Sequence, residues 1–211
     1  SALGPLGLAL GGWVIGGAAV DLWSRSGRSA LGARLTRLRR LPRADWGRGL
    51  AHGGLGVTII GIAGLLAWQQ EDIRVAEIGD SWSLGRYEIT LDAVRESRGP
   101  NYITTVGELS VRSGGAQVAT LLPEKRFYPV AGMPTTEAGI DGGLWRDLYL
   151  VIGDPQEGGG WAMRSHVKPM AAWIWGGCIL MALGGALSLT DRRMRVAAGA
   201  RRAAPAPVAA Q

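Results

Sequence analysis

Histidine is the residue type in this sequence with the strongest potential for chemistry, because its ring can titrate near neutral pH and can bind a metal. The 211 residues contain two histidines. One of them, His52, lies in the stretch RGLAHGGLGVTIIGIAGLLAW, in which no charged residue follows Arg48 before Glu71. An ionisable side chain inside such an apolar segment is rare, and it is a candidate for function by default.

The surroundings of His52 leave three interpretations open. Its ring could bind a metal or a haem iron, take part in a proton relay, or form a hydrogen bond to a headgroup or a neighbouring residue. Gly56 lies one helical turn further along, on the same face. It is expected to leave room beside the ring for a flat macrocycle, whereas Gly53 and Gly54 point elsewhere. Gly56 favours ligation without excluding the other two roles.

The other candidate residues favour ordinary roles. His166, in RSHVKP, is expected to be a solvated or interface residue rather than a ligand. Cys178 is the one cysteine, so no intrachain disulfide can form, and within an apolar run it is expected to be a small buried hydrophobic residue. Neither a serine or cysteine triad nor zinc-ligand spacing occurs. Five charged residues could form a docking surface but are expected to be ordinary strand-edge charges: Glu124, Lys125, Arg126, Arg146 and Asp147.

Membrane helices and one large loop must position these residues. The chain is 47% hydrophobic and only 19% charged. Three apolar runs approach the roughly 20 residues that a membrane-spanning helix needs, and their glycines predict close helix packing. We divide the chain into a first span over 1–23, a basic loop over 24–48, a second span over 49–68, an outer domain over 69–168, a third span over 169–190 and a tail over 191–211.

The arginines are gathered in two blocks that set the expected orientation. One block lies over 24–48 and the other follows the third span, so three crossings place both on the same side of the membrane. The positive-inside rule makes that side cytoplasmic and puts 69–168 in a periplasm-like space. A net charge of +6 distributed in this way argues against nucleic-acid binding.

Two cytoplasmic features accompany these blocks. Leu31, Leu35, Leu38 and Leu41 recur at helical spacing with arginines on the other face. They predict a short basic helix that either lies on anionic lipid or serves only as a topology determinant. The tail AAPAPVAAQ is of low complexity and is expected to be disordered.

The outer segment has the alternation of β-strands. GRYEITLDAV places Tyr87, Ile89, Leu91 and Ala93 on one face. NYITTVGELSVR and QVATLLPEKRFYPV flank the turn SGGA and predict a hairpin, and LWRDLYLVIGD and WAMRSHVK are further strand candidates. The predicted fold class is an integral membrane protein with α-helical transmembrane spans and a β-rich periplasmic domain, barrel- or sandwich-like, inserted between the last two spans.

Several strings resemble the C-terminal part of CcmF, the family of large membrane subunits of the bacterial cytochrome c haem lyase. They are DWGRGLAHGGLGVTIIGIAG, GPNYITTVGELSV, LLPEKRFYPVAGMPTTEAGIDGGLWRDLYLVIGDP and KPMAAWIWGGCILMALGGALSLTDRR. The resemblance extends from about Trp46 to Arg193 and is most specific over Pro123–Pro155.

The resemblance implies a haem b held in the membrane between two histidines on different helices. His52, in LAHGGLGV, stands where the family has one axial ligand of the haem iron. The other axial histidine lies upstream in the family and outside this chain. The family's WWD segment with its two external histidines is also missing from this sequence, and His166 does not replace them. We therefore interpret the chain as a piece of a larger protein, assign it no catalytic residue and leave open whether it is itself an enzyme.

The function that the resemblance implies is attachment of haem to apocytochrome c through thioether bonds in the periplasm, by a multi-pass protein of the bacterial inner membrane. The implied partners are apocytochrome c, CcmH-like and CcmE-like maturation proteins, and membrane lipid. The alternative is a non-catalytic membrane scaffold whose periplasmic domain binds assembly partners and in which His52 is only structural. A proton-translocating or transport subunit is disfavoured, because the spans hold few ionisable residues.

Overall fold

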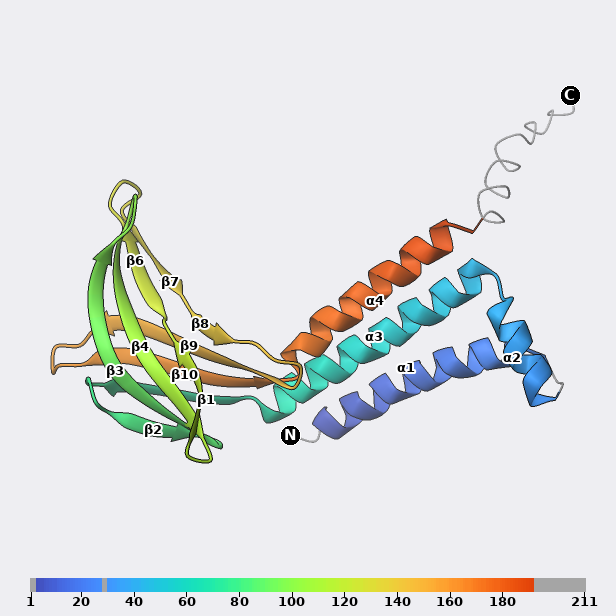
Figure 1. The fold of residues 1–211 in the computed structure, drawn as a ribbon, viewed down its shortest axis with the longest axis horizontal. Helices are drawn as coiled ribbons and strands as arrows, with labels where there is room; N and C mark the ends of the chain where they lie inside the picture. Colours follow the sequence, from blue (N-terminus) through green and yellow to red (C-terminus); the bar gives the residue numbers. More distant parts are fainter. Residues whose placement is uncertain (1–2, 28–29, 192–211) are drawn as a thin grey trace, which may run out of the picture. The chain divides into compact units, whose positions relative to one another are not determined.

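Three long apolar helices and a β-sandwich make up residues 3–27 and 30–191, the part of the chain that the computed structural model describes (Figure 1). The helices are α1 (Leu3–Arg25), α3 (Arg43–Trp68) and α4 (Ala171–Leu189), with a short α2 (Leu31–Arg39) between the first two. The chain forms two compact units, a sandwich unit over Gly64–Ala172 and a helical unit on either side of it in sequence. The tail over 192–211, predicted to be disordered, lies outside the described residues.

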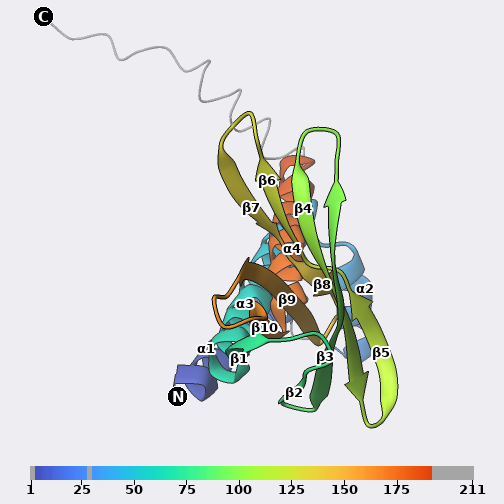
Figure 2. The same cartoon turned by 90° about the vertical axis from the view of Figure 1, so that its left-hand side faces the viewer.

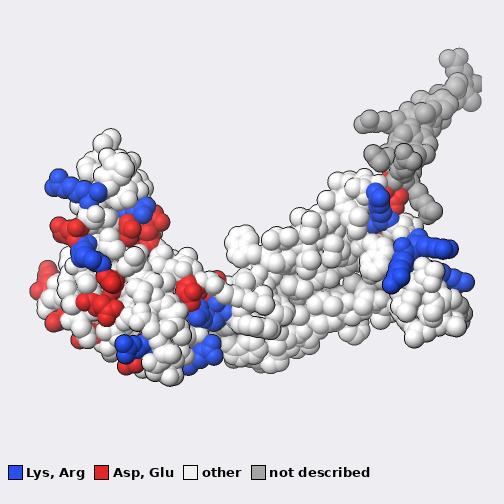
Figure 3. Space-filling view, in the orientation of Figure 1, with Lys and Arg blue, Asp and Glu red and all other residues white. Residues whose placement is uncertain are grey.

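The three long helices are each long and apolar enough to cross a membrane. On the face seen in Figure 3 the helices carry no charged side chains along most of their length, and arginines gather at the end that carries α2. Helix α3 begins at Arg43, well before the predicted start of the second span at residue 49. Pro42 is at the N-cap position, since its carbonyl accepts the first backbone hydrogen bonds of the helix from Asp45 and Trp46. The predicted basic helix is α2.

Glycines bring α3 into close contact with both other long helices. A Cβ atom built at Gly56 lies 2.7 Å from the carbonyl oxygen of Gly11 in α1, and one built at Gly54 lies 2.7 Å from that of Gly177 in α4. Such distances leave no room for a methyl group. Lipid tails are as apolar as side chains, so close van der Waals contact of this kind is a main source of helix association in a membrane.

The end of α4 is also joined to the start of α3. The backbone N–H of Ala44 donates a hydrogen bond of 3.0 Å to Oδ2 of Asp191, a residue only 7% exposed. Ala44 lies in the first turn of α3, where backbone N–H groups have no partner within the helix. The carboxylate therefore supplies an acceptor and a favourable charge at a helix N-terminus.

Two antiparallel sheets form the sandwich unit, and the barrel alternative does not apply. One sheet has the order β1-β10-β9-β8, and the other has β2-β3-β4-β6-β7 with β5 also paired to β4. Figure 2 shows the long, curved β3 and β4 of the second sheet. The strands are β1 (Gln70–Ala76), β2 (Ser81–Leu84), β3 (Tyr87–Arg98), β4 (Ile103–Ser113), β5 (Ala116–Leu121), β6 (Glu124–Tyr128), β7 (Met133–Glu137), β8 (Gly139–Asp141), β9 (Arg146–Pro155) and β10 (Trp161–Pro169).

The core of the sandwich lies between the inner faces of the two sheets. Ile152 on β9 and Leu109 on β4 are both fully buried, and they belong to one hydrophobic cluster. Trp82 on β2 is buried in the same cluster, and its indole N–H donates a hydrogen bond to Oγ of Ser165 on β10. The buried hydroxyl thus has a partner from the opposite sheet, as a polar group in a core requires.

The predicted hairpin around SGGA is confirmed as the pair β4–β5. Gly114 and Gly115 both have positive φ, 59° and 82°, which the tight turn between twisted strands requires and glycine adopts without strain. The second predicted strand is split near Pro123. Its first part, β5, pairs with the C-terminal half of β4, and its second part, β6, pairs with the N-terminal half.

The predicted alternation on β3 is correct up to Leu91 and wrong after it. Tyr87, Ile89 and Leu91 are buried, but the register with β4 shifts between Leu91 and Ala93. A β-bulge adds one residue to a strand and reverses the faces beyond it. Val94, rather than Ala93, therefore packs against the core.

The close approach of α3 and α4 predicts a position-specific effect of one methyl group. A Cβ at Gly177 lies 2.5 Å from the Gly54 carbonyl oxygen, whereas at the neighbouring Gly176 no atom lies within 4 Å. Gly177→Ala should therefore destabilise the helical unit by about 1–3 kcal/mol through overpacking, and Gly176→Ala should not. Thermal unfolding in detergent, followed by helical circular dichroism, compares the two. Equal destabilisation would contradict this contact.

Candidate functional site

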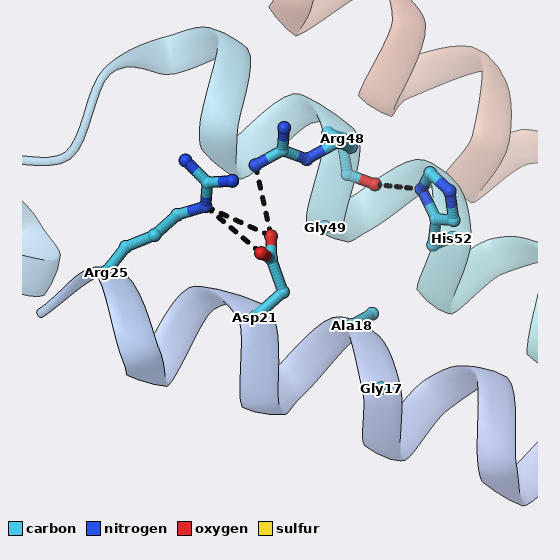
Figure 4. A pocket seen from close by; sticks show the side chains of 7 residues that line it. All are labelled: Gly17, Ala18, Asp21, Arg25, Arg48, Gly49 and His52. Carbon is cyan, nitrogen blue, oxygen red and sulfur yellow. Dashed lines mark hydrogen bonds and ion pairs between the residues drawn. The ribbon is translucent and has the colours of Figure 1, made fainter.

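The His52 ring is oriented by its own helix. Its Nδ1 lies 2.9 Å from the carbonyl oxygen of Arg48, one turn earlier in α3 (Figure 4). A carbonyl can only accept, so this hydrogen bond requires that Nδ1 carries the proton. In the neutral ring Nε2 then has a free lone pair. The side chain is exposed on α3, which leaves this nitrogen open to a ligand or to another helix.

A cavity of about 290 Å³ adjoins the ring. Its walls come from α1 and α3 and include small residues, which keep side-chain atoms away from the space beside His52. The lining residues are Gly17, Ala18, Asp21, Arg25, Arg48, Gly49 and His52 (Figure 4). A hollow with one imidazole nitrogen beside small residues, bounded by Asp21, Arg25 and Arg48, is a chemically suitable place for a flat metal-bearing ligand.

The expectation that Gly56 clears space beside His52 is wrong. Helix α1 fills that position, because a Cβ at Gly56 would lie 2.5 Å from Cγ1 of Ile15. Gly56 serves helix packing instead. Gly53, which we expected to contribute less, has no atom within 4 Å of a built Cβ.

Four charged side chains join α1 to α3 at the edge of this cavity. Asp21 accepts hydrogen bonds from Arg25 Nε, at 3.1 Å, and from Arg48 Nη2, at 3.0 Å. Asp45 completes the network, with Arg25 Nη1 at 3.2 Å and Arg48 Nη2 at 3.1 Å. Two carboxylates and two guanidinium groups thus neutralise one another, which lowers the cost of charges near an apolar segment.

This network was not predicted from the sequence. The spacing of Asp21 and Arg25 by four residues is a readable helical ion pair. The partnership of Asp21 with Arg48 joins residues 27 positions apart, and it depends on which faces of α1 and α3 meet. No local pattern carries that information.

His166 makes contacts within the sandwich. It lies on β10 opposite Glu71 on β1 and Tyr149 on β9. Its Nε2 is 3.7 Å from Oε1 of Glu71, and its ring meets the Tyr149 ring edge-on with centroids 5.6 Å apart. In the described part of the chain, no group of three or more histidine, cysteine or acidic residues could hold a metal ion.

The strand-edge charges are also satisfied within the sandwich. Arg126 pairs with Glu124 at 2.8 Å, and the pKa of Arg126 is raised mainly by that hydrogen bond. Lys125 pairs with Asp154. Arg146 donates to Asp141, and Asp147 accepts from the backbone N–H of Gly143. Internal pairing favours the interpretation as ordinary charges over a docking surface.

Cys178 corrects another expectation. Its side chain is exposed on α4 rather than buried. Three helices cannot enclose all of each other's faces, so an apolar residue of a span can face lipid or a further helix.

Comparison with known proteins gives matches to CcmF and to other cytochrome c-type biogenesis proteins. Residues 67–169 match a family model described as the CcmF C-terminal beta-sandwich. The chain is 58% identical over 209 residues to the cytochrome c-type biogenesis protein ccl1 of Rhodobacter capsulatus, covering 99% of this chain and 31% of that protein. It is 39% identical over 208 residues to the cytochrome c-type biogenesis protein CcmF of Escherichia coli, covering 98% of this chain and 31% of that protein.

A solved structure named cytochrome c heme lyase CcmF has the same fold, with a TM-score of 0.57 at 21% identity, over 90% of this chain and 34% of that one. The chain therefore spans about a third of the length of the curated relatives it matches.

Burial predicts a pH dependence of sandwich stability that involves His166. Burial lowers the pKa of His166; Glu71 opposes this effect, and Lys168 and Arg164 add to it. As the pH falls, the unfolded chain, whose histidine has an ordinary pKa, takes up the proton before the folded protein does. The free energy of unfolding is therefore highest above the unfolded pKa, and it decreases until the pH has fallen through the lower, folded pKa. The melting temperature of the sandwich should thus fall less in His166→Gln than in the parent between about pH 7.5 and 5. An equal fall in both proteins would contradict this role.

Proposed function

We propose the role of this chain from one premise: it belongs to the CcmF family of cytochrome c-type biogenesis proteins. In this proposal it is the C-terminal segment of a haem lyase subunit and supplies His52 as one axial ligand of a membrane haem b. Attachment of haem to apocytochrome c is then the task of the longer protein, because this chain spans only about a third of its relatives. No residue of this chain is assigned to the covalent step.

The hydrogen bond from His52 Nδ1 to the Arg48 carbonyl oxygen is the observation that carries the proposal. A metal-binding histidine usually donates its other ring N–H to a carbonyl or a carboxylate, which fixes the tautomer and raises the basicity of the ligating nitrogen. Here Nε2 is that nitrogen. The small residues Gly17, Ala18 and Gly49 supply the adjoining hollow that a flat ligand needs.

The residues of this chain would hold and orient rather than react. Arg48 bonds the ring through its carbonyl and is itself held to Asp21 on α1 through its guanidinium group. The ligand position is thereby tied to two helices. The second axial histidine would come from a helix outside these 211 residues. A haem with two histidine ligands has no open position for substrate and therefore supplies electron transfer when bound.

The proposed topology places the arginine-rich segment over 24–48 in the cytoplasm and the sandwich in the periplasm of a bacterial inner membrane. The charge distribution supports it, because arginines at the α2 end of the helical unit obey the positive-inside rule (Figure 3). The proposed partners are apocytochrome c and CcmH-like and CcmE-like maturation proteins, which would meet the chain on the sandwich side. A non-catalytic scaffold is the second candidate, in which His52 only bonds its own backbone.

Removal of His52 should abolish the haem b signal. In the full-length protein that carries this chain, purified in detergent, His52→Ala should lose the low-spin b-type absorption bands, because the iron loses one axial nitrogen. Added imidazole should restore them by occupying the vacated position. His166→Ala is the matched control, since it removes the other histidine of the chain and should leave the bands unchanged. An unchanged spectrum in His52→Ala would favour the scaffold.

The topology makes a separate prediction about protease access. A protease of broad specificity added to intact spheroplasts should cut the loop that follows β6, where Val130 is 99% exposed. The segment over 24–48 should be cut only after the membrane is opened. Cleavage confined to 24–48 in intact spheroplasts would reverse the proposed orientation.

A further inference from the structure

A second cavity, of about 380 Å³, lies at one edge of the sandwich unit and has no part in the site around His52. Two indoles and two guanidinium groups contribute to its walls. The residues that matter here are Trp68, Trp145, Arg86, Tyr87 and Arg146. Aromatic walls combined with cations suit a ligand that has both an apolar body and an anionic group.

This cavity lies at the ends of two apolar helices. Trp68 is the last residue of α3, and Pro169 on the cavity wall is two residues before α4 begins at Ala171. The backbone N–H of Met170 donates a hydrogen bond of 2.9 Å to the Trp145 carbonyl. Trp145 is thereby held beside the point where the chain enters α4. In a membrane protein such a position is at the level of the lipid headgroups.

The side chains at this level are of the type that membrane interfaces favour. Trp68 is 51% exposed, Trp145 is 65% exposed and Leu144 is 64% exposed. Indole rings prefer the boundary between headgroups and acyl chains, because one part of the ring is apolar and its N–H is polar. Leu144 and Trp145 are neighbours in the chain, and two exposed apolar side chains at this level suit contact with lipid.

The cavity also carries one positive charge that no carboxylate offsets. Tyr87 Oη accepts hydrogen bonds from Arg86 Nε at 3.0 Å, Arg86 Nη2 at 2.8 Å and Arg146 Nε at 2.8 Å. Arg146 is neutralised by Asp141, whose Oδ2 is 2.5 Å away. Among the residues that the structure describes, Arg86 has no carboxylate within ion-pair distance.

The neighbouring hollow carries one further charge of each sign beside Arg86. Glu88 on β3 and Arg112 on β4 are directly opposite each other in the register, and both line the neighbouring hollow with Arg86. The Tyr87 hydroxyl accepts these hydrogen bonds and positions the Arg86 guanidinium group, but it supplies no carboxylate to pair with its charge. Guanidinium groups bind phosphate oxygens well, because their N–H groups form a planar fork.

We propose that this cavity binds the phosphate of an anionic phospholipid in the leaflet next to the sandwich. Arg86 contacts the phosphate, and Trp68 and Trp145 pack against the glycerol and the first acyl carbons. A single cation beside apolar walls suits a lipid better than free phosphate, which needs several donors to replace its water. The lipid thereby anchors the edge of the sandwich to the membrane surface.

Native mass spectrometry of the full chain in detergent tests this proposal with phosphatidylglycerol as the probe. Arg86→Gln should weaken binding about fivefold, the usual effect of one basic residue near an anionic membrane surface. Arg98→Gln is the matched control. Arg98 is the last residue of β3 and Arg86 directly precedes its first residue, Tyr87, and both arginines are exposed. The control removes one charge and should leave binding unchanged. Arg86→Lys keeps the positive charge and should therefore retain most of the phosphatidylglycerol binding.

Further measurements separate the lipid from other occupants. Trp145→Ala should also weaken phosphatidylglycerol binding, and millimolar inorganic phosphate should not displace the lipid. Equal binding by the parent and Arg86→Gln would overturn the site. Displacement by inorganic phosphate, with no effect of Trp145→Ala, would overturn the lipid assignment in favour of a small anion. Circular dichroism of each variant verifies that the sandwich is folded, and only folded variants are compared.

Discussion

The close approach of α3 to α1 and α4 is the contact on which the helical unit depends. Lipid offers no hydrophobic drive for helices to associate, so close van der Waals contact is a main source of their association. Where the helices cross, a glycine leaves room for a backbone oxygen of the neighbouring helix. Gly56 does so toward α1 and Gly54 toward α4, on two sides of α3. With α1 at this distance, Asp21 and Arg25 reach the charged residues near the start of α3.

Arg48 connects this packing to the candidate ligand. Its guanidinium group belongs to the ion network between α1 and α3, and its carbonyl oxygen accepts the hydrogen bond that His52 Nδ1–H donates. One residue thus fixes both the pairing of the helices and the tautomer of the imidazole. A ligand that must hold a metal at a defined position needs this kind of support, because a freely rotating ring would spread its nitrogen over many positions.

The sequence predicts most of the elements and few of their contacts. Apolar runs, the arginine blocks and the SGGA turn depend on local chemistry, and the spans, α2 and the β4–β5 hairpin follow from them. The bulge after Leu91 does not, because Ala93 continues the alternation that a regular strand would have. Gly56 was assigned to the wrong purpose for a similar reason: helical spacing gives the face on which a residue lies, but not the neighbour that covers it. The partners of Asp21 depend on that same tertiary information.

The central claim is that His52 presents Nε2 to a haem iron while Nδ1 stays bonded to its own helix. Electron cryomicroscopy of the full-length protein that carries this chain, purified with its haem, tests it most directly. We expect density that joins His52 Nε2 to the iron, with Nδ1 still within hydrogen-bond distance of the Arg48 carbonyl oxygen. A haem whose two axial ligands are both other residues, or one bound through Nδ1, would contradict the claim.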